Sequence, residues 1–301
     1  MSKSPRWKAI LRQFGLHLFL LTVTATVLFP ILWIVSLALD PRNIDKPLEL
    51  TLLPPGASLA AFRKVLFEPF TLLCTNPTDP ASCMTFGKLL LNSLYASLGT
   101  ALFAVGLGSS AAYAFSRFDF IGRQAGMLGF IVLLMLPSTA TLAPLYVLLS
   151  AIKTGGEPLR ATLLGLAIAY ASGTLPFAVW NLKGYFDTVP RELEEAALID
   201  GDSITQVFFR IILPLSLPAM AVTVLFAFMA GWTEFVLAWA FLDDPRRFTL
   251  AMALRSMQGQ FSTPWSEFAA MSILMSLPVV VLFFLMQRHI VSGLTVGSVK
   301  G

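Results

Sequence analysis

The amino-acid sequence predicts an all-α membrane protein with six transmembrane helices, and three observations support this fold class. Of the 301 residues, 56% are hydrophobic. Only 13% are charged, whereas charged residues make up about 25% of an average soluble protein. Six stretches are apolar over a length that can cross a bilayer, which takes about 20 residues. A soluble fold of this size could not hide so much apolar surface, so the solvent must be lipid.

The predicted spans are residues 14–39, 89–115, 125–150, 161–180, 215–241 and 268–286. The first follows Lys3, Arg6, Lys8 and Arg12, as the core of a signal peptide would follow basic residues. Its apolar run of about 25 residues is longer than the 7–15 residue core of a cleaved signal. We therefore interpret it as a retained helix.

Several spans contain proline, which bends a helix and frees backbone carbonyls. Neighbouring membrane helices can satisfy those carbonyls, so bent packing is the simpler interpretation. The alternative is a broken helix beside a solute pathway. The prolines concerned are Pro30, Pro137, Pro144, Pro176, Pro218 and Pro278.

The second predicted span carries small residues at a helical spacing. Ala104, Gly108 and Ala112 recur every four residues. Small side chains on one face allow a second helix to approach closely. We therefore expect a close helix contact there.

The basic residues decide the orientation only weakly. Lys and Arg are divided almost evenly between the two sides, but the basic residues before the first span favour a cytoplasmic amino terminus. Six spans then place both termini and a polar loop at 187–214 in the cytoplasm. The predicted organisation is a tail at 1–13, a transmembrane domain at 14–292 with an outer loop at 40–88, and a tail at 293–301.

The predicted outer loop contains two cysteines, Cys74 and Cys83, in a turn-rich stretch. They lack the second pair or the histidines that a zinc site needs. If the loop faces an oxidising compartment, a Cys74–Cys83 disulfide is the favoured interpretation. Two unpaired thiols are the alternative.

Between the fourth and fifth predicted spans the hydrophobicity falls sharply, and the sequence predicts two short helices at an elbow. Pro190 suits a first helical turn, where its missing N–H is harmless. The acidic residues Glu192, Glu194 and Glu195 favour the positive start of the helix. Gly201 readily takes the left-handed conformation that ends a helix.

The second short helix is expected to begin at a cap formed by Asp202 or Ser203. Two helices joined at such an elbow form a rigid protrusion. The small residues Ala196 and Ala197 leave its surface open to the groove of another protein.

The residue spacing in this loop resembles a family signature. Glu195-Ala196-Ala197 is followed after three residues by Gly201, and nine residues later by Ile211-Ile212-Leu213-Pro214. Every defined position matches the signature loop of binding-protein-dependent ABC importer permeases. The chain also resembles the maltose-type subunits of that family over most of its length, from Phe29-Pro30 to Val299-Lys-Gly301.

The resemblance implies the six-helix fold of a type I ABC importer permease with a cytoplasmic coupling helix. In that family the coupling helix sits in a cleft of a separate ABC ATPase dimer, so Glu195 is expected to pair with a basic residue there. The residues expected to couple this chain to the ATPase are Glu194, Glu195, Ala196, Ala197, Gly201, Ile211, Leu213 and Pro214.

Two further segments receive expected roles from the resemblance. The tail after Gly293 is expected to reach between the two ATPase subunits. Residues Ser256, Met257, Gln258, Gly259 and Gln260 resemble the loop that probes the sugar cleft of an extracellular binding protein.

The implied function is transport, without catalysis by this chain. The resemblance implies a subunit that works with a second, paralogous permease subunit in a bacterial plasma membrane. It implies import of maltose, maltodextrin or a related disaccharide such as trehalose. The sequence has no Gly-x-x-x-x-Gly-Lys-Ser/Thr motif, so ATP and magnesium are expected on the partner ATPase and no cofactor in this chain. The net charge of +4 includes no basic block that would track a nucleic acid.

Glu234 suggests a rival function, because it is a carboxylate deep inside a hydrophobic run. Such an acid would suit a proton relay in an ion-coupled secondary carrier. From Leu215, a helix would place Glu234 about 28 Å along its axis, near the far edge of a bilayer core of about 30 Å. A hydrated or hydrogen-bonded structural acid is therefore the favoured interpretation. An intramembrane enzyme is disfavoured, because the sequence lacks His-Glu-x-x-His and Gly-x-Ser-x-Gly.

Overall fold

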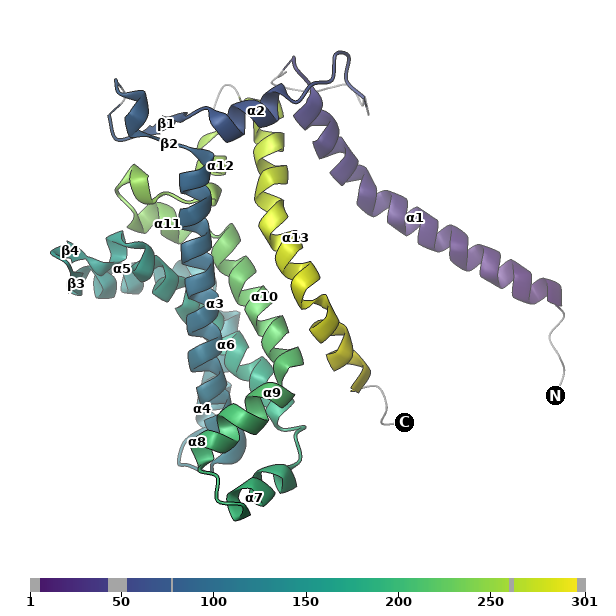
Figure 1. Cartoon of the computed structure of the whole chain (residues 1–301), viewed down its shortest axis with the longest axis vertical. Helices are drawn as coiled ribbons and strands as arrows, with labels where there is room; N and C mark the ends of the chain where they lie inside the picture. The colour runs from purple at the N-terminus through teal and green to yellow at the C-terminus, as the bar shows by residue number, and fades with distance from the viewer. Residues whose placement is uncertain (1–5, 43–52, 77, 260–262, 297–301) are drawn as a thin grey trace. The chain divides into compact units, whose positions relative to one another are not determined.

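The computed structural model describes residues 6–42, 53–76, 78–259 and 263–296. The chain forms two compact units, which are described separately. The first unit comprises residues 1–68 and 257–275, and the second comprises residues 69–256 and 276–301. Figure 1 shows the helices and strands of both units.

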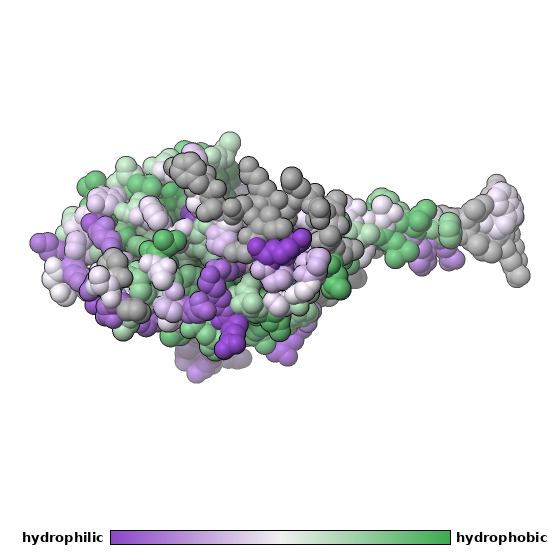
Figure 2. All heavy atoms as spheres, turned by 90° about the horizontal axis from the view of Figure 1, so that it is seen from above, coloured by the Kyte–Doolittle hydropathy of each residue, from purple (hydrophilic) through white to green (hydrophobic). Residues whose placement is uncertain are grey.

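The first unit contains α1 (Arg6–Leu39), α2 (Ala60–Phe67) and the beginning of α13 (Trp265–Val296). The segment Gln13–Leu39 of α1 is apolar and long enough to span a membrane, and its most apolar window is 0% buried within the chain. Large hydrophobic side chains are also exposed elsewhere in the chain, and Figure 2 shows hydrophobic surface interspersed with polar residues. Such a surface suits a chain that is surrounded by lipid or by other membrane subunits.

Polar contacts connect the ends of these three helices. Ser266 Oγ donates to the backbone carbonyl of Asp40 at 2.6 Å. Lys64 Nζ and Glu267 Oε1 form an ion pair at 2.6 Å. A hydrogen bond from Arg42 holds the pKa of the Asp40 carboxyl below its usual value. Polar contacts therefore link the three helices at one end.

Three long helices form the core of the second unit: α3 (Phe86–Arg117), α6 (Leu163–Phe186) and α10 (Leu217–Thr233). They pack against one another through small residues. A Cβ built on Gly231 of α10 would lie 2.9 Å from Thr100 Oγ1 of α3. A larger side chain at Gly231 would therefore push the two helices apart.

The closest packing is between α3 and α6. A Cβ built on Gly108 would lie 2.8 Å from the Cβ of Ala178, and one built on Gly99 would lie 2.9 Å from the Cβ of Ala167. Real Cβ atoms essentially never approach this closely. The close helix contact predicted from the small residues of the second span is therefore confirmed.

The third predicted span, 125–150, is a bent pair of helices rather than one continuous helix, and it counts as one span if the pair is taken together. The chain forms α4 (Arg123–Met135), the 3-10 turn η2 (Ser138–Thr141) and α5 (Leu142–Ala151), with a bend of 105° between the two helices. Pro137 and the residue before it have extended backbone. Proline lacks an N–H and disfavours the helical conformation in the preceding residue, which explains the break.

The fifth predicted span, 215–241, also divides. A bend of 79° separates residues 204–215 from α10, and α10 ends before α11 (Val236–Phe241) begins. By contrast, Pro30 and Pro176 lie inside continuous helices. Prolines therefore lie both inside continuous helices and at a break, and a solute pathway beside the break stays a prediction.

The all-α fold class is confirmed. Among the described residues, four helices are long and apolar enough to cross a membrane, and there are up to six spans if each bent helix pair counts as one. Apart from the elements between α6 and α10, the remaining elements of the second unit are short. They are β1 (Phe70–Cys74), η1 (Pro80–Ser82), β2 (Cys83–Met84), β3 (Lys153–Thr154), β4 (Glu157–Pro158), η3 (Leu159–Ala161), η5 (Pro245–Arg247) and α12 (Leu250–Ser256).

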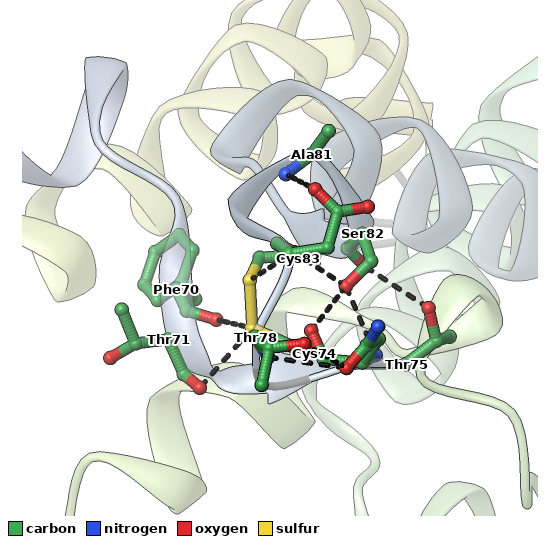
Figure 3. The surroundings of a disulfide bond; sticks show 10 residues. Phe70, Thr71, Cys74, Thr75, Thr78, Ala81, Ser82 and Cys83 are labelled. Atoms are coloured by element: carbon green, nitrogen blue, oxygen red, sulfur yellow. Dashed lines mark hydrogen bonds between the residues drawn. A yellow bond between two sulfur atoms is a disulfide. The ribbon is translucent and has the colours of Figure 1, made fainter.

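The two cysteines lie side by side in the antiparallel hairpin of β1 and β2 (Figure 3). The Cα atoms of Cys74 and Cys83 are 3.8 Å apart, and their sulfurs form a disulfide. Within the turn, Ser82 Oγ donates to the carbonyl of Asn76 at 2.7 Å and accepts the Asn76 N–H at 3.0 Å. The disulfide thus closes a turn that its own polar groups already hold.

Gly108→Ala is expected to destabilise the second unit by about 1–3 kcal/mol, because the added methyl group overpacks the contact with Ala178. Gly106→Ala is the matched control on the same helix, since nothing lies within 4 Å of its added Cβ. Thermal unfolding of the purified protein in detergent measures both variants. Equal melting temperatures would contradict the close packing of α3 on α6.

The Cys74–Cys83 disulfide is expected in the native protein, where closing so short a loop contributes about 2–3 kcal/mol to local stability. Alkylation of the unreduced chain followed by intact mass measurement should find neither thiol modified. Prior reduction should then allow both to be alkylated. Two alkylated thiols without reduction would refute the disulfide.

Candidate functional site

The polar loop between α6 and α10 folds into a helical hairpin, here called the hairpin (residues 191–215). Its elements are α7 (Arg191–Ile199), α8 (Ile204–Val207), the π-helical turn η4 (Phe208–Ile212) and α9 (Leu213–Leu215). Within the second unit, α7 and α8 lie at one end of α3, and β1 and β2 lie at the other (Figure 1). Pro190 is the N-cap of α7, one position before the expected first turn.

Gly201 ends α7 in the left-handed conformation, with φ 97°, as predicted. Its N–H donates to the carbonyl of Leu198, and the N–H of Asp202 donates to the carbonyl of Ala197. This pair of hydrogen bonds is a Schellman motif. Nothing lies within 4 Å of a Cβ built on Gly201, so the need for glycine there is conformational rather than steric.

Of the two predicted caps for the second helix, Ser203 is the one used. Ser203 Oγ accepts the Gln206 N–H at 3.3 Å, and the Gln206 side chain accepts the Ser203 N–H at 2.7 Å. These reciprocal bonds form a capping box. Asp202 instead pairs with Arg210 at 3.2 Å. Both sides of the elbow therefore have satisfied backbone groups, which makes the hairpin rigid.

The predicted coupling residues of α7 divide between two faces of the helix. Glu194 and Ala197 are buried against the rest of the second unit. Glu195, Ala196 and Ile199 are exposed. The expectation that Ala197 lies on the open surface with Ala196 is therefore wrong, because Glu194 and Ala197, three residues apart, share the face of α7 that packs against the rest of the second unit.

Apolar packing holds the hairpin against α3 and α6. The buried cluster comprises Ala112, Tyr113, Leu182, Phe186, Val189, Ala197, Val207, Phe208, Ile212 and Ala219. The ring centroids of Tyr113 and Phe208 are 5.0 Å apart. Of the remaining signature residues, Ile211 and Leu213 pack against this cluster, and Pro214 is exposed.

A buried ion pair also joins α7 to α3. Arg117 Nε donates to Glu194 Oε1 at 2.5 Å, and the two side chains are only 8% and 10% exposed. The Tyr113 hydroxyl donates to Glu194 Oε2 at 2.9 Å. Arg117 Nη2 donates to the carbonyl of Val189 at 3.0 Å. Removing one partner of a buried pair typically costs about 3–5 kcal/mol, so this contact strongly fixes α7.

A second polar contact joins α3 to the end of α6. Ser116 Oγ donates to Asp187 Oδ1 at 2.6 Å, and Lys183 Nζ pairs with Asp187 Oδ2 at 2.6 Å. Burial raises the pKa of Asp187, but hydrogen bonds from Lys183 and Ser116 outweigh burial and hold the pKa below its usual value. Arg117 Nη1 donates to Ser116 Oγ at 3.2 Å, so the two polar contacts share one guanidinium.

Sequence reasoning did not select Arg117 or Tyr113. The one sequence feature that could have drawn attention to Arg117 is its position just beyond the second predicted span. Its partner Glu194 is 77 residues away in the chain, and no local pattern connects the two. Only the packing of the helices brings them together.

At the other end of α3, polar side chains anchor the segment that leads to α12. Asn92 Nδ2 donates to the carbonyls of Arg246 and Phe248, each at 2.9 Å. The next residue, Ser93, accepts the first N–H of α12 at 2.7 Å through its buried hydroxyl. The start of α12 is therefore held in place by α3.

The predicted binding-protein loop begins where α12 ends. Ser256 is the last residue of that helix, Met257 is buried, and Gln258 and Gly259 are exposed. Gln260 lies outside the described residues. A role for this loop in binding remains a prediction.

Glu234 lies between α10 and α11, and its carboxylate caps α11. It accepts the backbone N–H groups of Val236, Leu237 and Ala238 at 2.9–3.3 Å. These bonds give the acid a structural task, which favours the structural interpretation over a proton relay. In the part of the chain that the structure describes, no cluster of three or more His, Cys, Asp or Glu residues could hold a metal ion.

Comparison with known proteins identifies relatives along nearly the whole chain. Residues 104–296 match the family described as "Binding-protein-dependent transport system inner membrane component". The maltose/maltodextrin transport system permease protein MalG of Yersinia pestis is 33% identical over 291 residues, covering 97% of this chain and 94% of that protein. The maltodextrin transport system permease protein MdxG of Bacillus subtilis is 39% identical over 214 residues, covering 70% of this chain and 74% of that protein.

Solved structures show the same fold. A chain of a bacterial ABC transporter involved in the import of the acidic polysaccharide alginate superposes with a TM-score of 0.69. The match covers 96% of this chain and 98% of that chain at 19% sequence identity. Because the family match extends over more than half of the chain and its relatives cover nearly all of it, this chain belongs to the inner-membrane components of binding-protein-dependent transport systems, the ABC importer permeases.

Proposed function

We propose that this chain is a permease subunit of an ABC importer that moves a sugar delivered by an extracellular binding protein. The energy comes from hydrolysis of ATP, which a separate ABC ATPase dimer binds together with magnesium. A second, paralogous permease subunit completes the pathway across a bacterial plasma membrane. The names of the relatives MalG and MdxG support maltose or maltodextrin as the solute. A related disaccharide such as trehalose is the alternative.

The observation that carries this proposal is the outer face of the hairpin. The Schellman motif and the capping box make the elbow rigid, and the buried cluster fixes it to α3 and α6. Glu195 and Ala196 remain exposed beside Ile199, which is 85% exposed. A short helix with a small residue, a large apolar residue and a charge on its free face suits docking in a groove of another protein.

Coupling then follows from differential binding. The ATPase dimer closes when it binds ATP, and the docked hairpins move with it. The two permease subunits rock between inward-open and outward-open states, and each state is favoured by the contacts that it gains. In this scheme Glu195 pairs with a basic residue of the ATPase, the residues after Gly293 reach between the ATPase subunits, and residues 256–260 probe the docked binding protein.

Glu195→Lys is expected to weaken ATPase binding about tenfold, a loss of about 1.4 kcal/mol, because it places a like charge against the expected basic partner. Glu192→Lys is the matched control, since Glu192 is exposed in the same helix but lies outside the signature. For both variants, the amount of ATPase that co-purifies measures ATPase binding, and the rate of ATP hydrolysis with the binding protein measures coupling. Wild-type values for Glu195→Lys would contradict the proposed docking face.

The proposed orientation places the hairpin in the cytoplasm and residues 58 and 154 on the outer side. In a background without Cys74 and Cys83, a cysteine at Ser203 should resist a membrane-impermeant thiol reagent in intact cells. Cysteines at Ser58 and Thr154 should react, and permeabilised cells provide the control for reactivity at Ser203. Labelling at Ser203 from outside would reverse the orientation and exclude the ATPase partnership.

A further inference from the structure

Glu194 and Glu195 are adjacent in the signature loop but have different surroundings. Glu195 is exposed on the free face of α7. Both carboxylate oxygens of Glu194 have partners within this chain: Oε1 accepts from Arg117, and Oε2 accepts from the Tyr113 hydroxyl. Glu194 is therefore directed into the permease rather than toward a docked protein.

Arg117 connects three segments through one planar group. Its Nε donates to Glu194 in α7, its Nη1 to Ser116 in α3, and its Nη2 to Val189 in the connection between α6 and α7. A guanidinium holds its donors in a fixed fork, so it specifies the direction of each partner as well as the distance. The relative positions of the three segments thus depend on this side chain.

A buried ion pair resists sliding in a way that apolar packing does not. Burial of two charges costs desolvation, and an apolar pair of the same size is often as stable. Separating the charges in a low-dielectric interior is nevertheless strongly unfavourable. The apolar contacts of Ala197 and Phe208 in the same junction have no preferred direction. The ion pair is therefore the contact best suited to pass a displacement of α7 to α3.

The helix that receives this displacement is a stiff body. α3 has 32 residues without an internal proline, and Gly99 and Gly108 bring it into close contact with α6. Packed helices of this kind move as units rather than deform continuously. A displacement at Arg117 would therefore move α3 and α6 together.

We propose that the Arg117–Glu194 ion pair is the joint through which the hairpin moves α3, and that both are positioning residues without contact to the ATPase. This inference rests on the proposed function, because it assigns the internal half of the same coupling site. It divides the acidic pair of the signature loop between two tasks: Glu195 docks, and Glu194 transmits.

The test uses Glu194→Gln in the assembled transporter, reconstituted in proteoliposomes with its ATPase, second permease subunit and binding protein. Glutamine keeps the size of the side chain and removes its charge. We expect wild-type co-purification of the ATPase, and at least a fivefold fall in solute transported per ATP hydrolysed. A merely structural role would reduce the yield of transporter without changing this ratio.

Two milder variants keep the test independent of folding. Tyr113→Phe removes only the hydroxyl that donates to Glu194 and retains the packed ring, so a smaller fall in the same ratio is expected. Arg117→Lys keeps the positive charge, but one ammonium group cannot reproduce the fork that joins Glu194 and Val189. An intermediate ratio is expected for that variant.

If the amount of solute transported per ATP is unchanged in both Glu194→Gln and Tyr113→Phe, the proposed role of the Arg117–Glu194 ion pair is wrong. Loss of ATPase co-purification in Glu194→Gln would also overturn it, because Glu194 would then be a docking residue. Failure of the proposed function would give a different result. Glu195→Lys would then bind the ATPase normally, whatever the Glu194 variants do.

Discussion

The close approach of α3 and α6 is the constraint on which the second unit depends. At Gly99 and Gly108 the two helices are so near that an added methyl group would not fit. Lipid provides no hydrophobic force between membrane helices, so their association relies on van der Waals contact, which small residues maximise. The hairpin connects to α6 through the chain and to α3 through buried contacts. Its position in space therefore follows from this helix pair.

The two ends of α3 hold the two segments with expected external partners. At one end, Arg117 fixes the hairpin that is proposed to meet the ATPase. At the other end, Asn92 and Ser93 hold the start of α12, which leads to the proposed binding-protein loop. Within the second unit, one helix thus fixes both the hairpin and the start of α12.

The bent spans show how the chain satisfies backbone groups where a helix is interrupted. Glu234 accepts the backbone N–H groups at the start of α11, in a sequence region that is otherwise strongly apolar. Unpaired N–H groups are costly in such surroundings. Capping of α11 is therefore a structural role that accounts for Glu234 without proton transfer. The break at Pro137 belongs to the same class of local interruption, with proline as its cause.

Features that depend on composition or on a few neighbouring residues could be predicted from the sequence. The all-α membrane class follows from the apolar spans, and the Gly201 turn follows from the permissive backbone of glycine. A cap at Asp202 or Ser203 follows from the residue types at the helix start, and Ser203 is the one used. The family signature is likewise a pattern of residues in one loop. Each of these features has its physical cause within a short stretch of chain.

Features that depend on distant segments were decided only by tertiary structure. Proline favours a break but does not impose one, since the chain breaks at Pro137 and continues as one helix through Pro176. The inward face of α7 is the one that meets α3, so Ala197 is buried and Ala196 is exposed. Glu194 gained its partner Arg117 from 77 residues away. Burial and ion pairing depend on distances in space, and packing between remote helices sets those distances.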